Sequence, residues 1–193
     1  MPNRIGILGG TFDPLHIGHL IVAQEVQEKL KLDRIFFIPT SLPPHKKKVK
    51  ISSSVHRLRM VQLAAQANPN FKVLDLELKR KGHSYTVDTL RILGKKYPQT
   101  KFVLILGLDN LNHIHTWKKP EEIFRLSQVI FISRPGATFN KANKWLKQSK
   151  FLEVKEIEIS STDIRERVRK RKSIRYMVPE EVLKYIKKHN LYK

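Results

Sequence analysis

The segment from Gly9 to His19 has glycines and histidines at a spacing that suits phosphate binding. It reads GGTFDPLHIGH and follows a short apolar run. Gly9 and Gly10 allow the backbone to approach a ligand closely. His16 and His19 stand three residues apart at a predicted helix start, so they share one helix face, and a helix N-terminus favours anions. The segment therefore predicts a site for the oxygens of a polyphosphate.

The two histidines taken alone allow other interpretations. A His-x-x-His pair is common on ordinary protein surfaces, and a metal-binding pair is a second alternative. The segment is neither a P-loop nor a Gly-x-Gly-x-x-Gly fingerprint, because its glycine spacing differs and no lysine follows. The whole eleven-residue string is more specific than either pair within it.

A second phosphate-binding pattern lies near the other end of the chain. Residues 159–165 read ISSTDIR after an apolar run. Ser161 and Thr162 supply hydroxyl groups at a predicted helix start, and Arg165 supplies a guanidinium in its first turn. Such a start can cradle a phosphate, although an ordinary helix cap has the same residue types.

The chain after the apolar run 101–106 carries a third candidate group. Gly107 and Asp109 follow directly, and a carboxylate just beyond a strand can accept hydrogen bonds from ribose hydroxyls. Trp117 in the next polar stretch can stack on an aromatic ring, or it packs locally. Lys46 lies in a polar loop and can close over a phosphate when a ligand binds.

Apolar runs alternate with amphipathic runs along the chain, which predicts alternating strands and helices. The predicted strands are Arg4–Leu8, Arg34–Pro39, Phe71–Leu78, Lys101–Leu106, Gln128–Ser133 and Phe151–Ile159. The predicted helices are Ile17–Leu30, a helix from Ser53 or Ser54 to Ala65, Thr86–Lys96, Pro120–Leu126, Phe139–Gln148, Ser161–Lys170 and Pro179–His189. The polar stretch Thr40–Ser54 is predicted to be a mobile loop.

This alternation predicts an α/β fold, a doubly wound parallel sheet with helices on both faces. One domain spanning residues 1–193 is expected, with its C-terminal helices from about residue 161. Ligands of such sheets bind beyond the carboxyl ends of the strands, at the switch point. The candidate segments described above all follow predicted strands, so they should meet there.

Composition narrows the class of protein. The 193 residues contain no cysteine, which excludes disulfide scaffolds, iron–sulfur clusters and cysteine nucleophiles. The longest apolar run, about Phe102–Leu108, is far short of the roughly 20 residues of a membrane helix. No signal peptide is evident at the first residues, so we expect a cytoplasmic protein without a membrane partner.

The net charge of +21, from 38 Lys and Arg against 17 Asp and Glu, suits anionic partners. A solvated basic surface is the alternative. The charges are spread along the chain, most densely from Arg165 to Arg175. They accompany no aromatic-rich RNA motif and no zinc-finger spacing, so no nucleic-acid partner is expected.

Together these motifs resemble the bacterial nicotinate-nucleotide adenylyltransferase family, within the nucleotidyltransferases of the His-x-Gly-His type. The resemblance covers essentially the whole chain. Its strings are GGTFDPxHxGH at 9–19, PPHK at 43–46, GxSYTxDTL at 82–90, GxD at 107–109 followed by Trp117, RPG at 134–136, ISSTxIR at 159–165, YMVP at 176–179 and LY at 191–192. Arg171 departs from the family, in which many members are expected to have glycine.

The resemblance implies transfer of AMP from ATP to nicotinate mononucleotide, giving deamido-NAD and pyrophosphate, with Mg²⁺ held mainly by the ATP phosphates and no protein metal site. It implies a catalytic role for His16 and His19. The implied ATP contacts are Gly9, Gly10, Thr11, Phe12, His16, His19, Gly107, Asp109, Arg134, Ser161, Thr162 and Arg165. The implied mononucleotide contacts are His45, Lys46, Tyr85, Thr86 and Trp117. The oligomeric state is not implied.

Three alternatives remain at the level of sequence. Another adenylyltransferase of the superfamily, such as the phosphopantetheine enzyme, shares the nucleotide motifs but lacks the Ser84–Thr86 string. His16–His19 also matches a signature of class I aminoacyl-tRNA synthetases, but the chain is short for one and lacks their Lys-Met-Ser-Lys-Ser loop. A nucleic-acid-binding module is suggested by charge alone.

Overall fold

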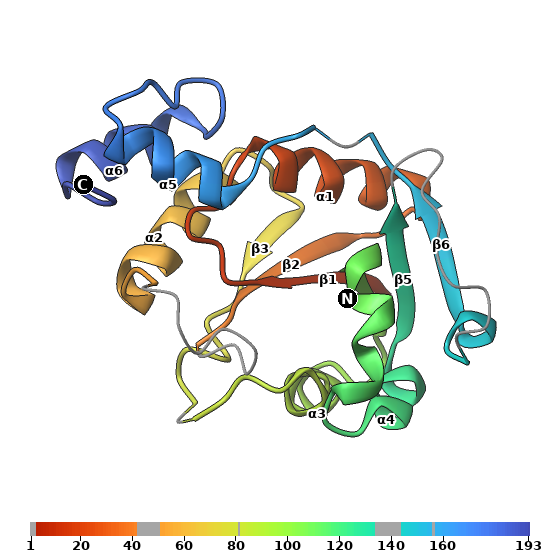
Figure 1. The fold of residues 1–193 in the computed structure, drawn as a ribbon. Helices are drawn as coiled ribbons and strands as arrows, with labels where there is room; N and C mark the ends of the chain where they lie inside the picture. The colour runs from red at the N-terminus through yellow and green to blue at the C-terminus, as the bar shows by residue number, and fades with distance from the viewer. Residues whose placement is uncertain (1–2, 42–50, 81, 134–143, 156) are drawn as a thin grey trace.

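A twisted parallel sheet forms the centre of the molecule (Figure 1). The computed structural model describes residues 3–41, 51–80, 82–133, 144–155 and 157–193. In these residues six strands are ordered β3-β2-β1-β4-β5-β6, and all neighbours run parallel. The strands are β1 (Arg4–Gly10), β2 (Arg34–Pro39), β3 (Phe71–Val73), β4 (Lys101–Gly107), β5 (Gln128–Ser133) and β6 (Ser149–Glu153).

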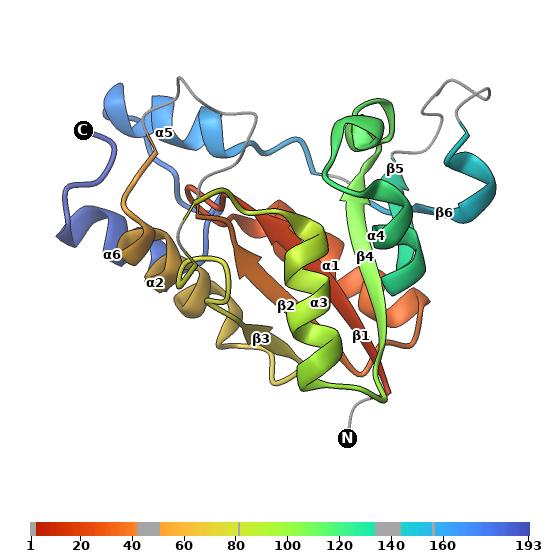
Figure 2. The ribbon, with the colours of Figure 1, turned by 90° about the horizontal axis from the view of Figure 1, so that it is seen from below.

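Helices cover both faces of the sheet (Figures 1 and 2). They are α1 (Ile17–Lys29), α2 (Ser54–Ala65), α3 (Thr86–Lys96), α4 (Pro120–Leu126), α5 (Ser161–Arg169) and α6 (Glu180–Lys188), with short 3₁₀ turns η1 (Leu108–Asn112), η2 (Ile114–Thr116) and η3 (Leu146–Gln148). The predicted doubly wound α/β fold is confirmed.

The strands are apolar on both sides because each side faces a helical layer. In β2, Ile35 and Phe37 pack into one buried cluster with α1, α2 and α6, whereas Phe36 and Ile38 pack into the other with α3 and α4. This alternation is the period of two that a strand imposes on its side chains. A strand buried on both faces therefore has the continuous apolar runs seen in the sequence.

The strand order places a crevice between β1 and β4. From β1 the chain winds outward through β2 and β3, and it then returns to β4 on the other side of β1. The connections after β1 and β4 consequently diverge at the carboxyl ends of these two neighbouring strands, which is where doubly wound sheets bind ligands. Gly10 and Gly107 are the last residues of the two strands.

Three predicted elements were wrong in extent. The strand predicted at Phe71–Leu78 ends at Val73. Its partner among the described strands, β2, reaches Pro39, two residues beyond the last pair of Phe37 with Val73, and Pro39 has no N–H to continue the ladder. The strand predicted at Phe151–Ile159 is β6, which begins at Ser149 and ends at Glu153 opposite Ser133, the last residue of β5.

The helix predicted at Phe139–Gln148 lies partly outside the described residues. In its described part the chain forms only the 3₁₀ turn η3 before β6 begins. Trp145, which starts this turn, is buried beside the sheet and stacks on Phe124 with ring centroids 4.8 Å apart.

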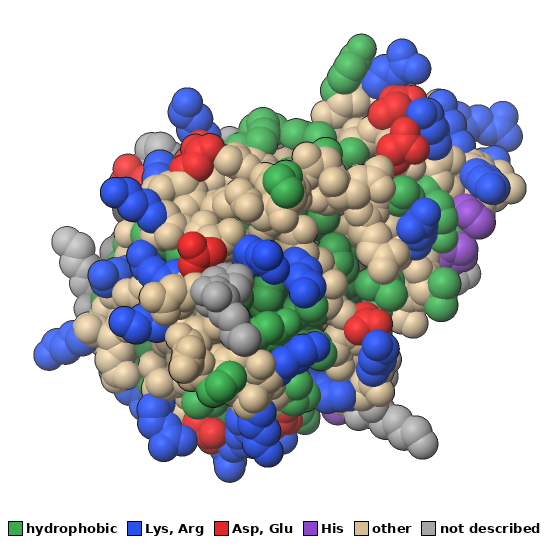
Figure 3. All heavy atoms as spheres, turned by 180° about the vertical axis from the view of Figure 1, so that it is seen from behind, with side chains coloured by type: hydrophobic (Ala, Val, Ile, Leu, Met, Phe, Trp, Pro, Cys, Tyr) green, Lys and Arg blue, Asp and Glu red, His purple; other side chains and the backbone are tan. Residues whose placement is uncertain are grey.

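No helix in the described ranges is long and apolar enough to span a bilayer. Lysine and arginine side chains are scattered over the face seen in Figure 3, with acidic side chains among them, and they do not form a single patch there.

Arg57 on α2 joins the loops that follow β1 and β2. Its side chain is 2% exposed and donates hydrogen bonds to four carbonyl oxygens. The acceptors and distances are Thr40 (2.7 Å), Thr11 (2.8 Å), Ser52 (3.1 Å) and Ser41 (3.3 Å). Burial lowers the pKa of this guanidinium, and the charge of Asp13 opposes that shift.

We predict that Arg57→Met destabilises the fold by about 3 kcal/mol, because it leaves four partly buried carbonyl groups without this donor. Equilibrium urea unfolding measures this loss. Arg59→Met on the exposed side of the same helix is the matched control and should change stability by no more than about 0.5 kcal/mol. Equal losses in the two variants would contradict the role given to Arg57.

Candidate active site

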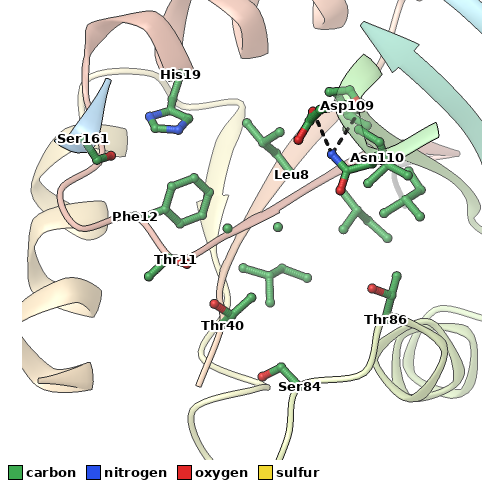
Figure 4. A pocket seen from close by; sticks show the side chains of 18 of the residues that line it. Leu8, Thr11, Phe12, His19, Thr40, Ser84, Thr86, Asp109, Asn110 and Ser161 are labelled. Atoms are coloured by element: carbon green, nitrogen blue, oxygen red, sulfur yellow. Dashed lines mark hydrogen bonds between the residues drawn. The ribbon is translucent and has the colours of Figure 1, made fainter. Parts of the chain in front are cut away.

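A cleft of about 740 Å³ opens at the carboxyl ends of β1 and β4. Its size suits a small-molecule site. Residues from the loops after β1, β2 and β4 and from the starts of α1, α3 and α5 line it, as Figure 4 shows in part. The lining includes Gly9, Gly10, Thr11, Phe12, His16, His19, Tyr85, Thr86, Gly107, Asp109, Trp117, Ser161, Thr162 and Arg165.

His16 and His19 lie against each other at the start of α1. Their ring centroids are 3.7 Å apart, and the backbone N–H of His16 donates to Nδ1 of His19 at 3.3 Å. Because Nδ1 of His19 accepts this bond, its Nε2 carries the proton and is a donor. The ring of Phe12 packs edge-on against His19 at 5.2 Å, which fixes the imidazole in place.

Burial keeps both imidazoles neutral. It lowers the pKa of His16 to about 4, and burial together with the neighbouring His16 lowers the pKa of His19 to about 3. Among the described residues, Nδ1 of His16 is buried and has no hydrogen-bond partner. An unpaired buried polar atom is uncommon and costly, so His16 leaves one ring nitrogen unsatisfied at the edge of the cleft that it lines.

The start of α5 meets the loop that precedes His16. Ser161 Oγ donates to the carbonyl of Pro14 at 2.8 Å, and Arg165 Nη1 donates to the carbonyl of Asp13 at 2.8 Å. Ser160 caps the helix by accepting from the N–H of Asp163 at 3.0 Å. Figure 4 shows Ser161 and His19 on the same side of the pocket. The two predicted phosphate-binding segments, about 150 residues apart in sequence, therefore converge.

Two glycines on the floor of the cleft leave room, one for a ligand and the other for the carboxylate of Asp109. A Cβ atom at Gly9 would meet no atom closer than 4.0 Å, so its position borders open space that a side chain would fill. A Cβ atom at Gly107 would lie 2.5 Å from Oδ1 of Asp109, a distance that atoms do not tolerate. Glycine at 107 thus allows the carboxylate to fold back beside β4.

Asp109 is held at the β4 end of the cleft by Asn110. The amide of Asn110 donates to Oδ1 of Asp109 at 3.1 Å and lies 3.2 Å from the carbonyl of Gly107. Asp109 itself is exposed, so its second oxygen is accessible. This arrangement presents a carboxylate acceptor at the edge of the site.

Away from the histidine pair, the cleft is bordered by the start of α3, where Figure 4 shows Thr86, and by the turn η2. Thr86 is the first residue of α3, and Tyr85 precedes it. Trp117 follows η2 and is partly exposed in the cleft. Ser84 Oγ accepts from the N–H of Ser41 at 2.9 Å, which ties this end to the loop after β2. An aromatic wall thus lies beside free N–H groups of a helix start.

Three predicted site residues, His45, Lys46 and Arg134, lie outside the described residues. The other predicted residues are brought together around the one cleft.

Sequence reasoning missed several residues that shape the site. Arg57 could have been found from the sequence, because its position at helical spacing puts it on the same face of α2 as the apolar residues Met60, Val61 and Ala64. Glu77 has no such signal in the sequence. It is buried behind Ser84 and accepts from Thr89 Oγ1 at 2.7 Å, and burial raises its pKa.

The described residues contain no group of three or more His, Asp or Glu side chains that could hold a metal ion. Near the histidine pair, the carboxylate of Asp13 is engaged by the N–H of Ser52 at 3.0 Å and by the hydroxyl of Tyr192 at 2.7 Å.

Comparison with known proteins identifies the family. The model of the cytidylyltransferase-like family matches residues 7–167. The chain is 46% identical over 200 residues to a protein of Desulfitobacterium hafniense named "probable nicotinate-nucleotide adenylyltransferase", covering 100% of this chain and 97% of the relative. It is 42% identical over 190 residues to the nicotinate-nucleotide adenylyltransferase of Bacillus subtilis, covering 98% of each.

A similar fold occurs in a solved structure, Plasmodium falciparum nicotinic acid mononucleotide adenylyltransferase complexed with NaAD. The TM-score is 0.80 at 22% sequence identity, over 98% of this chain and 97% of that one. The similarity in sequence to the curated relatives is much higher and spans almost the whole chain. The family expected from the motifs is therefore confirmed: this chain belongs to the nicotinate-nucleotide adenylyltransferases, within the cytidylyltransferase-like family.

Proposed function

We propose that this chain transfers AMP from ATP to nicotinate mononucleotide, giving nicotinate adenine dinucleotide and pyrophosphate. An oxygen of the mononucleotide phosphate bonds to the α-phosphorus of ATP, and the bond from that phosphorus to the oxygen that bridges it to the β-phosphate breaks, so that pyrophosphate leaves with that oxygen. The observation that carries the proposal is the convergence of the α1 and α5 helix starts on one cleft whose far end is aromatic.

The ATP half of the site is assigned to the side where α1 and α5 begin. The backbone of Gly9, Gly10, Thr11 and Phe12 would border the nucleotide. His16 and His19 would donate to oxygens around the α-phosphate. Hydroxyls of Ser161 and Thr162, the guanidinium of Arg165 and the free N–H groups of α5 would hold the terminal phosphates. Asp109 suits the ribose hydroxyls, with Gly107 and Arg134 on the adenosine side.

The acceptor half is assigned to the side where α3 begins. Trp117 and Tyr85 offer faces on which a pyridine ring can stack. The nicotinate carboxylate would sit at the N-terminus of α3 near Thr86, where backbone N–H groups and the helix dipole favour an anion. His45 and Lys46 would reach the phosphates from the loop after β2.

The reaction needs alignment more than it needs proton transfer. The second ionisation of a phosphate monoester lies near pH 6, so the nucleophile is mostly deprotonated at neutral pH and no general base is required. Catalysis then depends on holding two anions in line and stabilising charge on the phosphoryl oxygens. Neutral imidazole N–H groups, hydroxyls and backbone donors supply this stabilisation in fixed positions.

Mg²⁺ is proposed as the cofactor, held mainly by the phosphates of ATP. The residues fit this arrangement, since Mg²⁺ is commonly bound through substrate phosphates, and the cleft offers hydrogen-bond donors that would position those phosphates. When bound, the ion would neutralise negative charge on the triphosphate.

The activity is tested by pyrophosphate release from ATP with nicotinate mononucleotide, nicotinamide mononucleotide and phosphopantetheine as separate acceptors. We expect release with nicotinate mononucleotide to be the fastest. Release only with phosphopantetheine would assign the chain to another reaction of the superfamily, and release with none would reject the proposed function.

Replacing His19 removes one proposed donor to the transition state. We predict that His19→Ala lowers turnover on the order of 10²-fold or more while the protein stays folded. His189→Ala is the control, because His189 is an exposed histidine that does not line the cleft. Near-normal pyrophosphate release by His19→Ala would remove His19 from the catalytic group.

Replacing Trp117 should affect the acceptor alone. We predict that Trp117→Ala raises the KM for nicotinate mononucleotide roughly 10-fold, through loss of a stacking surface, and leaves the KM for ATP within about twofold. Trp117→Phe keeps an aromatic face and should lie close to the wild type. A change confined to the KM for ATP would place Trp117 in the other half of the site.

The buried histidines also make stability depend on pH. Below pH 6.5 the unfolded chain binds protons on these histidines that the folded chain does not, so stability falls as the pH falls from about 7 toward 4. Each imidazole should cost about 1–2 kcal/mol at pH 5. In urea unfolding at pH 7.5 and pH 5, a His16→Asn, His19→Asn double variant should therefore lose less stability than the wild type. An equal loss would mean that the imidazoles are not buried as neutral groups.

A further inference from the structure

Asp13 is a buried carboxylate that no step of the proposed reaction uses. It is 4% exposed and lies in the loop between the glycines of β1 and His16. Its Oδ2 accepts from the N–H of Ser52 at 3.0 Å, and its Oδ1 accepts from the hydroxyl of Tyr192 at 2.7 Å. Each carboxylate oxygen thus has one donor, and the donors come from distant parts of the chain.

Tyr192 reaches this position from 179 residues away. Its backbone φ of 67° lies in the left-handed region, which costs energy for a residue other than glycine. Its hydroxyl also lies 3.7 Å from Sδ of Met60 on α2, and its aromatic ring packs against the cluster that contains α2 and α6. Side-chain packing therefore holds a strained residue where its hydroxyl meets Asp13.

The hydroxyl of Tyr192 stays protonated and can act only as the donor to the carboxylate. Burial, together with the charge of Asp13 and the hydrogen bond to it, raises the pKa of Tyr192 far above its usual range. A hydrogen bond from a neutral donor to a buried carboxylate is of the stronger, charge-assisted kind.

Asp13 also connects three parts of the site. The carbonyl oxygen of Asp13 accepts from Nη1 of Arg165 on α5 at 2.8 Å. Its carboxylate accepts from the N–H of Ser52, which lies two residues before the start of α2. The preceding residue, Phe12, packs against His19. A shift of Asp13 would therefore move the guanidinium of Arg165 and the ring that fixes His19.

We propose that Tyr192 is a positioning residue for the ATP half of the site: its hydrogen bond to Asp13 holds the 11–14 loop so that His16, His19 and Arg165 face one triphosphate. Tyr192 is absent from the described lining of the cleft and acts through Asp13, which lines it. The proposal rests on the proposed function for its kinetic test and on the geometry of the loop for its binding test.

The kinetic test is Tyr192→Phe, which removes only the hydroxyl. We expect kcat to fall roughly 10-fold and the KM for ATP to rise several-fold, because displacement of a positioning loop weakens alignment. The KM for nicotinate mononucleotide should stay within about twofold. Loss of folded protein would lower the apparent kcat but would change neither KM, so the split between the two KM values separates positioning from a structural role.

Tyr185→Phe is the matched control. The Tyr185 hydroxyl on α6 bonds His56 Nδ1 on α2 at 3.0 Å, and among the described residues it has no bond to the 11–14 loop. We expect its kinetic constants to match the wild type. Tyr192→Phe constants that equal those of Tyr185→Phe, or a rise in both KM values alike, would overturn the proposal.

A double-mutant cycle tests the route through Asp13. If Tyr192 acts only on this carboxylate, Tyr192→Phe combined with Asp13→Ala, which removes the acceptor, should have a kcat no more than about twofold lower than that of Asp13→Ala alone. If instead the fold-changes of the two single substitutions multiplied in the double variant, Tyr192 would act elsewhere and the proposal would be overturned.

A binding measurement keeps the test independent of the reaction. Calorimetric titration with α,β-methylene-ATP should show at least fivefold weaker binding to Tyr192→Phe than to the wild type or Tyr185→Phe. If the wild type released no pyrophosphate with nicotinate mononucleotide, the proposed function would fail, yet this titration would still decide the role of Tyr192. Equal affinities in all three proteins would overturn it.

Discussion

The organisation of this site depends on the repulsion between the two anions that must react. A triphosphate and a phosphate monoester have to come within bonding distance, and the site has to offset their charge. The described cleft meets this constraint mostly with dipoles: the starts of α1, α3 and α5, hydroxyl groups, and two imidazoles that burial keeps neutral. Preorganised dipoles of this kind need no rearrangement as charge moves during the reaction.

The sheet supplies the helix starts because of its strand order. Reversal between β1 and β4 turns the connections after these strands to opposite sides, so a crevice opens between them. Gly9, near the end of β1, leaves open space at that crevice, and Gly107, at the end of β4, leaves room for the carboxylate of Asp109. The large positive charge of the chain is spread over the surface seen in Figure 3, which fits long-range attraction of anions better than a dedicated binding patch.

Much of this could be predicted from the sequence, because the informative patterns are local. Apolar runs buried on both faces marked β1, β2, β4 and β5, and the Ser160–Thr162 hydroxyls marked the start of α5, where Ser160 is the cap. Element ends were harder, since neither β3 nor β6 stops where its own apolar residues stop. β6 ends opposite the last residue of β5, and β3 ends at Val73, short of the proline that ends β2.

The contacts that lock the site could not be predicted, because they join residues far apart in the chain. Nothing around Tyr192 or Asp13 indicates that they meet, and nothing near Glu77 indicates that Ser84 and Thr89 enclose it. Arg57 differs, since its place on the apolar side of α2 was visible in the helical spacing. Long-range hydrogen bonds of buried polar groups are set by the packed structure, and a single sequence does not encode them as a pattern.

The central claim is that the histidine pair of α1 and the hydroxyl-rich start of α5 bind one nucleotide between them. A crystal structure of the protein with α,β-methylene-ATP and Mg²⁺ tests it most directly. The account predicts phosphate oxygens within hydrogen-bond distance of the His16 and His19 imidazoles and also of the Ser161, Thr162 and Arg165 side chains. A nucleotide whose phosphates touch only one of these two groups, or neither, would contradict it.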